Sequence, residues 1–546
     1  MSSTTTGTKE NTVYKSKPDK IFIGMVSNII KHVYITFRIY LDLFIDLVYG
    51  YFWEGKRKPI PDLEKKHAML KESAVTLAAR IRNKQLKSED LVRTCIERIQ
   101  QVNPIINAVT DERYEAALKD AREVDRLIEN GLPDEYFQKK PFLGVPFSSK
   151  ESHAVAGMLH TLGIVARKDT RAHEDAECVR LVKESGAIPL VVTNVPEINK
   201  WMESRNYVFG QTCNPHHAGR TAGGSSGGEA ALHAAVSVPI SLCADIGGST
   251  RMPAFFCGLY AHNPTPGHTS LKGSALRKGD DYTMASVGFV SRHCSDLIPL
   301  TKIVAGDKAG LLDLDRAVDV KKLRYYYVES AGDLRVSPIC ADLKAAMNRA
   351  ITKLSEEVSS TSSAPQQFSH RGFNHLFLLW RYWMTKESDC FAKLITNNTG
   401  YASFYREFPK KLLGLSQYTF PAILKLFDEQ VMPPVNAEWA EGVTNELKDD
   451  LLELLGDDGV LLFPSSPLPA PYHYAAMVRP FNFGYWAVWN ALQFPATQVP
   501  LGLNSDGLPL GIQVVAGPRR DALCVAVGRL LGGALGGAAP PCELPL

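Results

Sequence analysis

The chain has 546 residues, of which 45% are hydrophobic and 22% are charged, proportions that are typical of a folded protein with a sizeable core. Its formal net charge is only +3, and no basic stretch alternates with aromatic residues, so the sequence indicates no nucleic-acid partner. The ten cysteines are scattered without a CxxC pair, which predicts reduced thiols, no metal site and no disulfide framework.

The amino-terminal part divides into two segments. Residues 1–20 are rich in Ser, Thr and Lys, and we expect them to be disordered. Residues 21–57 form a hydrophobic helix with a basic flank, in which Lys31, Arg38 and Asp42 fall on one side at about 100° per residue. Such a helix can lie in a membrane interface, cross the bilayer at a tilt, or dock on the protein's own core. Membrane association is the favoured interpretation.

Residues 58–546 are predicted to form the main domain. Within it, 73–84 and 88–102 are expected helices, each opened by a Ser that can cap backbone N–H groups, with Pro104 ending the second. The apolar run 187–192 predicts a buried strand, and the alternation of strand-like and helical segments predicts an α/β domain. Residues 467–517, rich in Pro, Gly and aromatic residues, are expected to form loops that line a site.

Two Gly/Ser clusters stand out. Residues 223–228 (GGSSGG) precede an expected helix at 229–237, and residues 245–249 (DIGGS) follow an expected strand at 239–244. Glycines allow successive backbone N–H groups to point at a single site, which is how an oxyanion hole is built. The candidate donors are the amides of Ile246, Gly247, Gly248 and Ser249.

Other interpretations of these clusters fit less well. Residues 223–227 match the GxSxG nucleophile elbow, but that motif requires a preceding strand, and the segment 214–222 contains Pro215 and cannot be a central strand. Neither cluster provides the GxxxxGK[ST] sequence of a phosphate loop. Each cluster alone is also compatible with a flexible linker.

Together, the clusters and the segments around them closely resemble the amidase signature family over about residues 70–530. The supporting segments are residues 141–146 leading to Lys150, residues 193–197, 263–267, 479–482 and 507–517. The resemblance implies a mixed central β-sheet flanked by helices in an α/β/α arrangement, preceded here by a membrane-associated helix.

The resemblance also implies a role for individual residues. Ser249 corresponds to the acylated nucleophile, Ser225 to a proton relay that follows a cis peptide bond, and Lys150 to the base. A lysine accepts a proton only in its neutral form, so its pKa must fall well below about 10.4, which burial in a dry site achieves. Auxiliary roles are implied for Ser226, Asp245 and Arg251.

This sequence departs from the family pattern at three places. Thr250 stands where Ile is usual, Ala244 replaces a usual Thr or Ser, and residues 261–263 read AHN instead of a more usual Gly, Phe or His, and Lys. None of these changes removes a group assigned to catalysis. They leave efficiency and substrate range open.

With the hydrophobic residues 21–53 added, the resemblance implies hydrolysis of fatty-acid primary amides and N-acylethanolamines through an acyl-enzyme, without a cofactor, at an intracellular membrane. A short-chain or aryl amidase or esterase, a glutaminase-type amidotransferase subunit, and a non-catalytic binding protein of the same fold are the alternatives. The hydrophobic segment argues against the amidotransferase subunit. A homodimer is compatible with the sequence but not indicated by it.

Overall fold

The computed structural model describes residues 18–279, 283–358, 364–387 and 390–543, with side chains from residue 29 onward. The segment expected to be disordered, residues 1–20, therefore lies outside the described part except for its last three residues. Those residues begin helix α1 (Pro18–Trp53).

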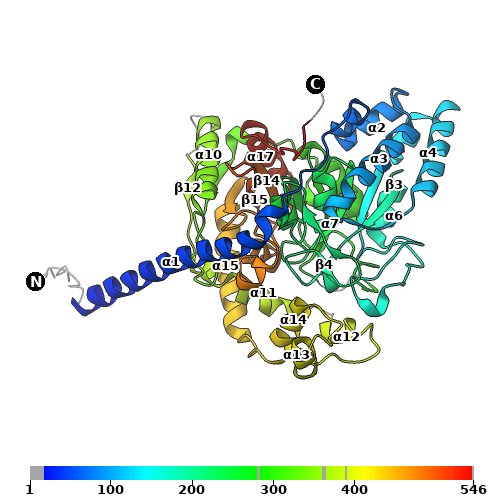
Figure 1. The fold of residues 1–546 in the computed structure, drawn as a ribbon. Coiled ribbons are helices and arrows are strands. Elements are labelled where there is room, and N and C mark those ends of the chain that lie inside the picture. Colours follow the sequence, from blue (N-terminus) through cyan, green and yellow to red (C-terminus); the bar gives the residue numbers. More distant parts are fainter. Residues whose placement is uncertain (1–17, 280–282, 359–363, 388–389, 544–546) are drawn as a thin grey trace, which may run out of the picture.

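A large mixed β-sheet lies at the centre of the molecule, with helices packed around it (Figure 1). Within the described residues this sheet has eleven strands, and both parallel and antiparallel neighbours occur. The mixed sheet expected from the resemblance is confirmed. In spatial order the strands are β1 (Val109–Glu112), β3 (Ile188–Thr193), β2 (Pro146–Lys150), β8 (Ile240–Asp245), β10 (Ser286–Ser291), β9 (Tyr260–Asn263), β14 (Ala496–Leu503), β15 (Pro509–Ala516), β13 (Gly459–Pro464), β11 (Arg324–Tyr327) and β12 (Gln366–Gln367).

Helices surround the sheet (Figure 1). Two small hairpins, β4–β5 (Arg205–Asn206 and Gly210–Gln211) and β6–β7 (Cys213–Asn214 and His217–Thr221), lie outside the main sheet. After α1, the helices are α2 (Ala74–Arg82), α3 (Ser88–Ile106), α4 (Tyr114–Glu129), α5 (Asp134–Lys139), α6 (Glu177–Glu184), α7 (Gly227–Ala234), α8 (Arg251–Cys257), α9 (Leu297–Ala305), α10 (Ala341–Glu357), α11 (Leu376–Met384), α12 (Phe391–Leu394), α13 (Phe404–Leu412), α14 (Phe420–Gln430), α15 (Ala437–Leu455), α16 (Gly484–Leu492) and α17 (Asp521–Ala534).

Two large apolar clusters make up the core, one drawn mainly from residues 60–304 and the other from residues 252–531. Helix α8 contributes to both, since Ala254 packs in the first cluster and Phe255 in the second. The helix that directly follows the DIGGS turn therefore joins the two halves of the core.

The two helices expected early in the main domain are present, with a correction to the second. Ser73 caps α2 by accepting the Thr76 N–H at 3.1 Å, as predicted. Ser88 does not cap α3, because its hydroxyl donates to the carbonyl of Gly144 at 2.7 Å. The prediction that Pro104 ends α3 is wrong: a proline in the last turn removes only one hydrogen bond, and the helix continues to Ile106.

The expectation of loops late in the chain is also wrong for much of residues 467–517. This stretch contains helix α16 and the two eight-residue strands β14 and β15. Both strands have a neighbour on each side and are mostly buried. Tertiary burial of their Val, Leu and Ile residues outweighs the weak strand propensity of the interspersed Pro and Gly.

Helix α1 projects from the molecule at its amino-terminal end and rests on it with its carboxyl-terminal half (Figure 1). Its charged stripe faces the main domain. Arg479 binds the carboxylates of Asp42 and Asp46, both at 2.7 Å. Arg38 donates to the hydroxyl of Ser337 at 3.3 Å, and that hydroxyl donates to Asp42 at 3.1 Å. The docked side of α1 thus combines these charged groups with the apolar residues Leu41, Ile45, Tyr49 and Trp53, which pack near Tyr472 and Ala475.

The opposite side of α1 exposes large apolar residues to solvent. They are Ile29, Ile30, Val33, Phe37, Tyr40, Leu43, Phe44, Leu47, Tyr51 and Phe52. In an amphipathic helix of a globular protein the side turned to solvent is usually polar, whereas here it carries large apolar residues. Across the described residues, no helix combines the length and the apolar character needed to cross a membrane.

Candidate active site

Two adjacent parallel strands bring the sequence motifs together. Strand β2 ends at Lys150 and β8 ends at Asp245, with Ser149 paired to Leu242. Because adjacent parallel strands end at the same edge of a sheet, the Lys150 side chain lies beside the turn that carries Ser249. The placement follows directly from the sheet topology.

Lys150 contacts the first of the two clusters directly. Its Nζ donates to Ser225 Oγ at 2.7 Å and to the carbonyl oxygen of Ala244 at 3.3 Å. The peptide bond between Gly224 and Ser225 is cis, in agreement with the resemblance. Lys150, Ser225 and Ser249 border the same cavity, which has a volume of about 60 Å³. The structure therefore brings together the three side chains to which the resemblance assigns catalysis.

The charge state of Lys150 is set by its surroundings. The side chain is 1% exposed, and burial lowers the pKa of its amine to about 8, against the opposing effect of nearby acidic groups, above all Glu229. An amine with this pKa is partly neutral near neutral pH, which is the condition for accepting a proton.

The carboxylate of Asp245 holds the turn that carries Ser249. Its Oδ1 accepts the Gly248 N–H at 2.7 Å, and its Oδ2 accepts the N–H groups of Thr250 at 3.1 Å and Arg251 at 3.3 Å. Burial alone would raise the pKa of Asp245, but the Arg251 charge and these hydrogen bonds outweigh burial and lower the pKa. The carboxylate thus stays ionised and fixes the turn.

Two tryptophans enclose the same turn. Gly248 has φ +104°, and a Cβ at this position would lie 2.4 Å from the Cβ of Trp486, so only glycine fits. On the other side, Trp380 Nε1 donates to the carbonyl oxygen of Ile246 at 2.8 Å. A Cβ on Gly247 would lie 2.9 Å from that same Nε1. The turn is therefore held by packing as well as by hydrogen bonds.

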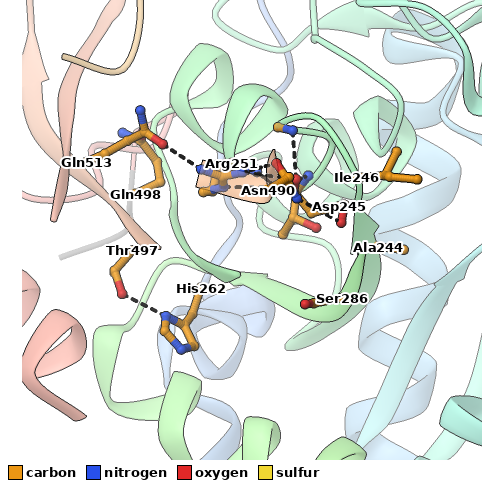
Figure 2. Close-up of polar contacts among 12 residues, drawn as sticks. Ala244, Asp245, Ile246, Arg251, His262, Ser286, Asn490, Thr497, Gln498 and Gln513 are labelled. Carbon is orange, nitrogen blue, oxygen red and sulfur yellow. Dashed lines mark hydrogen bonds and ion pairs between the residues drawn. The ribbon is translucent and has the colours of Figure 1, made fainter. Parts of the chain in front are cut away.

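Arg251 connects the turn to the carboxyl-terminal half of the molecule, as Figure 2 shows. Its guanidinium pairs with Asp245 at 3.0 Å and donates to Gln513 Oε1 and to Asn490 Oδ1, each at 2.7 Å. Asn490 in turn donates to the Asp245 carbonyl at 3.2 Å. All of these side chains are buried, and a buried ion pair is sustained only when its remaining groups are hydrogen-bonded in this way.

The hydrogen bonds of the turn show which backbone amides are available to bind an oxyanion. The Gly248 amide already donates to Asp245, so of the four expected donors it is engaged elsewhere in this structure. Within the described part of the chain, the amides of Gly247 and Ser249 have no hydrogen-bond acceptor. The Ser226 amide donates to the Ser249 carbonyl at 3.1 Å, and the Ser226 hydroxyl donates to the carbonyl of Ala244 at 3.5 Å. Ser226 therefore contacts the turn but does not line the cavity.

Of the departures from the family pattern, Thr250 and His262 are buried, whereas Ala244 is partly buried and borders the cavity at Ser249. Thr250 is 0% exposed, and its hydroxyl has no partner among the described residues. His262 hydrogen-bonds to Thr497 at 2.8 Å, as Figure 2 shows, and to Asp521 at 3.0 Å. Neither residue borders the cavity at Ser249. His262 ties strand β9 to the carboxyl-terminal half of the fold.

Sequence reasoning does not identify several residues around the site. Trp380 and Asn490 lie more than a hundred positions after Ser249, and no local pattern marks them. Gln513 lies in the family segment 507–517, but that segment gives no indication of its contact with Arg251. Glu229 could have been singled out from the sequence. It lies in an Ala-rich helix directly after GGSSGG, and a carboxylate buried there requires hydrogen-bond or charge partners. Over the described ranges, no group of three His, Cys, Asp or Glu side chains is placed to hold a metal ion.

Comparison with known proteins places this site in a family. The protein-family profile described as Amidase matches residues 90–525. The chain is 39% identical to Fatty-acid amide hydrolase 2 of Homo sapiens, over 85% of this chain and 89% of that protein. It is 38% identical to Fatty-acid amide hydrolase 2-A of Danio rerio, over 85% of this chain and 89% of that protein.

Solved structures agree on the fold. A 6-aminohexanoate cyclic dimer hydrolase superposes with a TM-score of 0.70 at 23% identity, covering 87% of this chain and 100% of the other. A fatty acid amide hydrolase superposes with a TM-score of 0.67 at 19% identity, covering 88% of this chain and 87% of the other. The family profile spans most of the chain, and the relatives match along nearly their whole length. The chain belongs to the amidase signature family and is an amide-hydrolysing enzyme.

Proposed function

We propose that this enzyme hydrolyses fatty-acid amides, namely primary amides and N-acylethanolamines, to free fatty acid and amine through an acyl-enzyme on Ser249. The observation that carries the proposal is the buried 2.7 Å contact between Lys150 Nζ and Ser225 Oγ, at the cavity that Ser249 also borders. A serine nucleophile needs a base, and a Ser–Lys pair is a known variant of the triad.

The proposed acylation step moves one proton. Ser249 Oγ attacks the amide carbonyl and passes its proton to Ser225, which passes its own to neutral Lys150. The Gly247 and Ser249 amides bind the oxyanion, with the Ile246 amide as a third candidate donor. The proton then returns through Ser225 to the nitrogen of the leaving amine, and the C–N bond breaks. Water hydrolyses the resulting ester on Ser249 by the same path in reverse.

Three features support a lipid as the acyl group. The relatives with 38–39% identity are named for fatty-acid amides. A second, largely apolar cavity of about 30 Å³ borders α8, the helix that begins two residues after Ser249. Its apolar lining includes Met252, Phe256, Phe483 and Trp486.

The third feature is the exposed apolar side of α1. Because the charged stripe is bound to Arg479, the large apolar residues on the other side face outward and can enter a lipid interface. We place α1 in the surface layer of an intracellular membrane, with the main domain held against it. Burial of apolar area in the bilayer provides the driving force.

The test is amide hydrolysis measured against acyl-chain length, from acetyl to about twenty carbons, in detergent micelles, with Ser249→Ala as the blank. We expect kcat/KM to rise with chain length, because each buried methylene contributes about 0.8 kcal/mol. Activity confined to acetyl and aryl amides would contradict the lipid assignment. Failure of a fluorophosphonate to label Ser249 would contradict the catalytic assignment.

A further inference from the structure

Glu229 is a buried carboxylic acid that the proposed proton path does not use. It lies in the first turn of α7, four residues after Ser225, and is 0% exposed. One carboxyl oxygen accepts a hydrogen bond from the Thr193 hydroxyl. The other, Oε2, has no partner among the described residues. Burying a carboxyl group with an unpaired oxygen costs free energy, so Glu229 is a candidate for a functional role.

The sheet places this carboxyl beside the base. Thr193 is the last residue of β3 and pairs with Lys150, the last residue of β2. The Thr193 side chain that holds Glu229 therefore lies next to Lys150 on the neighbouring strand. Helix α7 also carries Ser225 just ahead of its first turn, so Ser225 and Glu229 approach Lys150 from the same helix start.

The two groups influence one another electrostatically. Burial raises the pKa of Glu229 to about 8, and the positive charge of Lys150 opposes that rise. Burial lowers the pKa of Lys150 to about 8, and Glu229 is the first of the acidic groups that oppose this fall. Two interacting groups with such similar values titrate as a pair. The other ionisable groups that face the pair are Cys243, Asp245, Lys200, His153 and Glu151.

We propose that Glu229 is a positioning residue that stabilises the protonated form of Lys150 and so sets the lower pH limit of turnover; the inference rests on the proposed function of the triad. During acylation Lys150 gains a proton and becomes an ammonium in a dry site. The charge of Lys150 favours the ionised form of Glu229, and in that form the Glu229 carboxylate balances the ammonium, as the aspartate of a Ser-His-Asp triad balances the imidazolium. Glu229 itself exchanges no proton with the substrate.

The substitution Glu229→Gln keeps the shape of the side chain and removes its charge. The pKa of Lys150 then falls, because the anion that raised it is gone. We expect the acid limb of the pH profile to move to lower pH by about one unit. We also expect the plateau rate to fall about tenfold, because a base with a lower pKa is a weaker base.

The experiment measures the rate at which a fluorophosphonate labels Ser249 in the full-length protein between about pH 5 and 10. Wild type, Glu229→Gln and Glu229→Asp are compared. The inference is supported if Glu229→Gln moves the acid limb to lower pH and reduces the plateau labelling rate, while Glu229→Asp keeps the acid limb of the wild type. A merely structural role predicts slower labelling by both variants with the acid limb unmoved, and that result would overturn it.

A second variant covers the case in which Glu229→Gln does not fold. Thr193→Val removes the hydroxyl that donates to Glu229, so the carboxyl keeps its proton to higher pH. The acid limb should then move in the same direction by a smaller amount, and an unmoved limb overturns the inference. Labelling of wild-type Ser249 separates the two claims: its absence refutes the proposed function, whereas its presence with an unchanged Glu229→Gln profile refutes only the role of Glu229.

Discussion

As the proposed base, Lys150 is expected to make the reaction sensitive to pH. Burial lowers the pKa of its amine to about 8, and only the neutral amine accepts a proton. We therefore expect kcat/KM for amide hydrolysis to rise as the pH increases through about 8, and Lys150→Ala to remove both the activity and this limb. The measurement is a pH profile of kcat/KM with a neutral amide. A flat profile across this range would contradict the assignment of Lys150 as base.

Thr250 is a second residue whose effect can be measured. Its hydroxyl is buried without a partner among the described residues, and an unsatisfied buried polar group costs about 1–3 kcal/mol. Thr250→Val has nearly the same shape and removes that group, so we expect it to raise the free energy of unfolding by about 1 kcal/mol. Denaturant unfolding of the full chain checks the prediction.

The matched control is Thr444→Val. Thr444 is also buried, but its hydroxyl donates to the carbonyl of Ala440 at 2.7 Å and accepts from Trp383. This substitution should therefore lower stability. Equal destabilisation by both variants would show that the Thr250 hydroxyl has a partner in solution.

At this scale, the sequence identifies the proposed reacting groups through the family resemblance, but not the residues that hold them. Ser225 and Ser249 stand in Gly/Ser clusters, and Lys150 follows a segment that resembles the family. Trp380 and Asn490 act on the same turn from distant parts of the chain, and no local spacing reveals a contact of that range. The Gly248 amide shows a related limit, because its bond to Asp245 depends on the detailed shape of the turn.

Helix α11 carries two tryptophans, one that contacts the active-site turn and one that contacts another helix. Comparing their substitutions separates an effect on catalysis from an effect on stability. Trp380 donates to the Ile246 carbonyl at 2.8 Å, whereas Trp383 donates to Thr444 on α15 at 3.1 Å. Trp380→Phe removes the bond to the turn, so the oxyanion donors lose part of their fixed orientation. We expect kcat to fall about tenfold with KM little changed.

Trp383→Phe is the control for that prediction. It removes an equivalent N–H donor from the same helix without touching the turn, so it should lower thermal stability by a similar amount and leave kcat near the wild-type value. Steady-state kinetics with one amide substrate compares the two variants. An equal loss of kcat in both would assign the effect to the helix as a whole.

Element prediction succeeds where local preference and burial agree. The cap at Ser73 and the strand near residues 187–192 are examples, since both depend on adjacent residues. It fails in α3, where the helix tolerates Pro104, and in β14 and β15, whose strands are made by neighbours in the sheet. Tertiary packing decides these elements, and a single sequence contains little trace of it.

At the scale of the whole molecule, the outward apolar side of α1 predicts binding to lipid surfaces. Phe44 and Leu47 are 60% and 72% exposed, so replacing both with Glu should leave the fold intact while opposing insertion. We expect the Phe44→Glu, Leu47→Glu protein to lose flotation with liposomes, with little change in the hydrolysis of a short soluble amide.

Leu311→Glu serves as the matched control, because Leu311 is 53% exposed and lies far from α1 in the sequence. This variant should float with liposomes as the wild type does. Flotation of the double α1 variant at wild-type levels would show that this side of the helix does not bind lipid. The sequence predicted the amphipathic stripe of α1 and left its docking on the core as one of three alternatives. It could not decide between them, because the partner Arg479 lies more than four hundred residues away.

The hydrogen bonds of Arg251 also bear on when, during synthesis, the active-site turn becomes complete. Lys150, Ser225 and Ser249 have all left the ribosome long before Asn490 and Gln513, the residues that complete the Arg251 network. At a synthesis rate of about 5–20 residues per second, that interval lasts roughly 10–50 seconds. During it the nascent chain carries every proposed catalytic side chain on an incomplete turn. We therefore expect hydrolytic activity to appear only when translation is nearly finished.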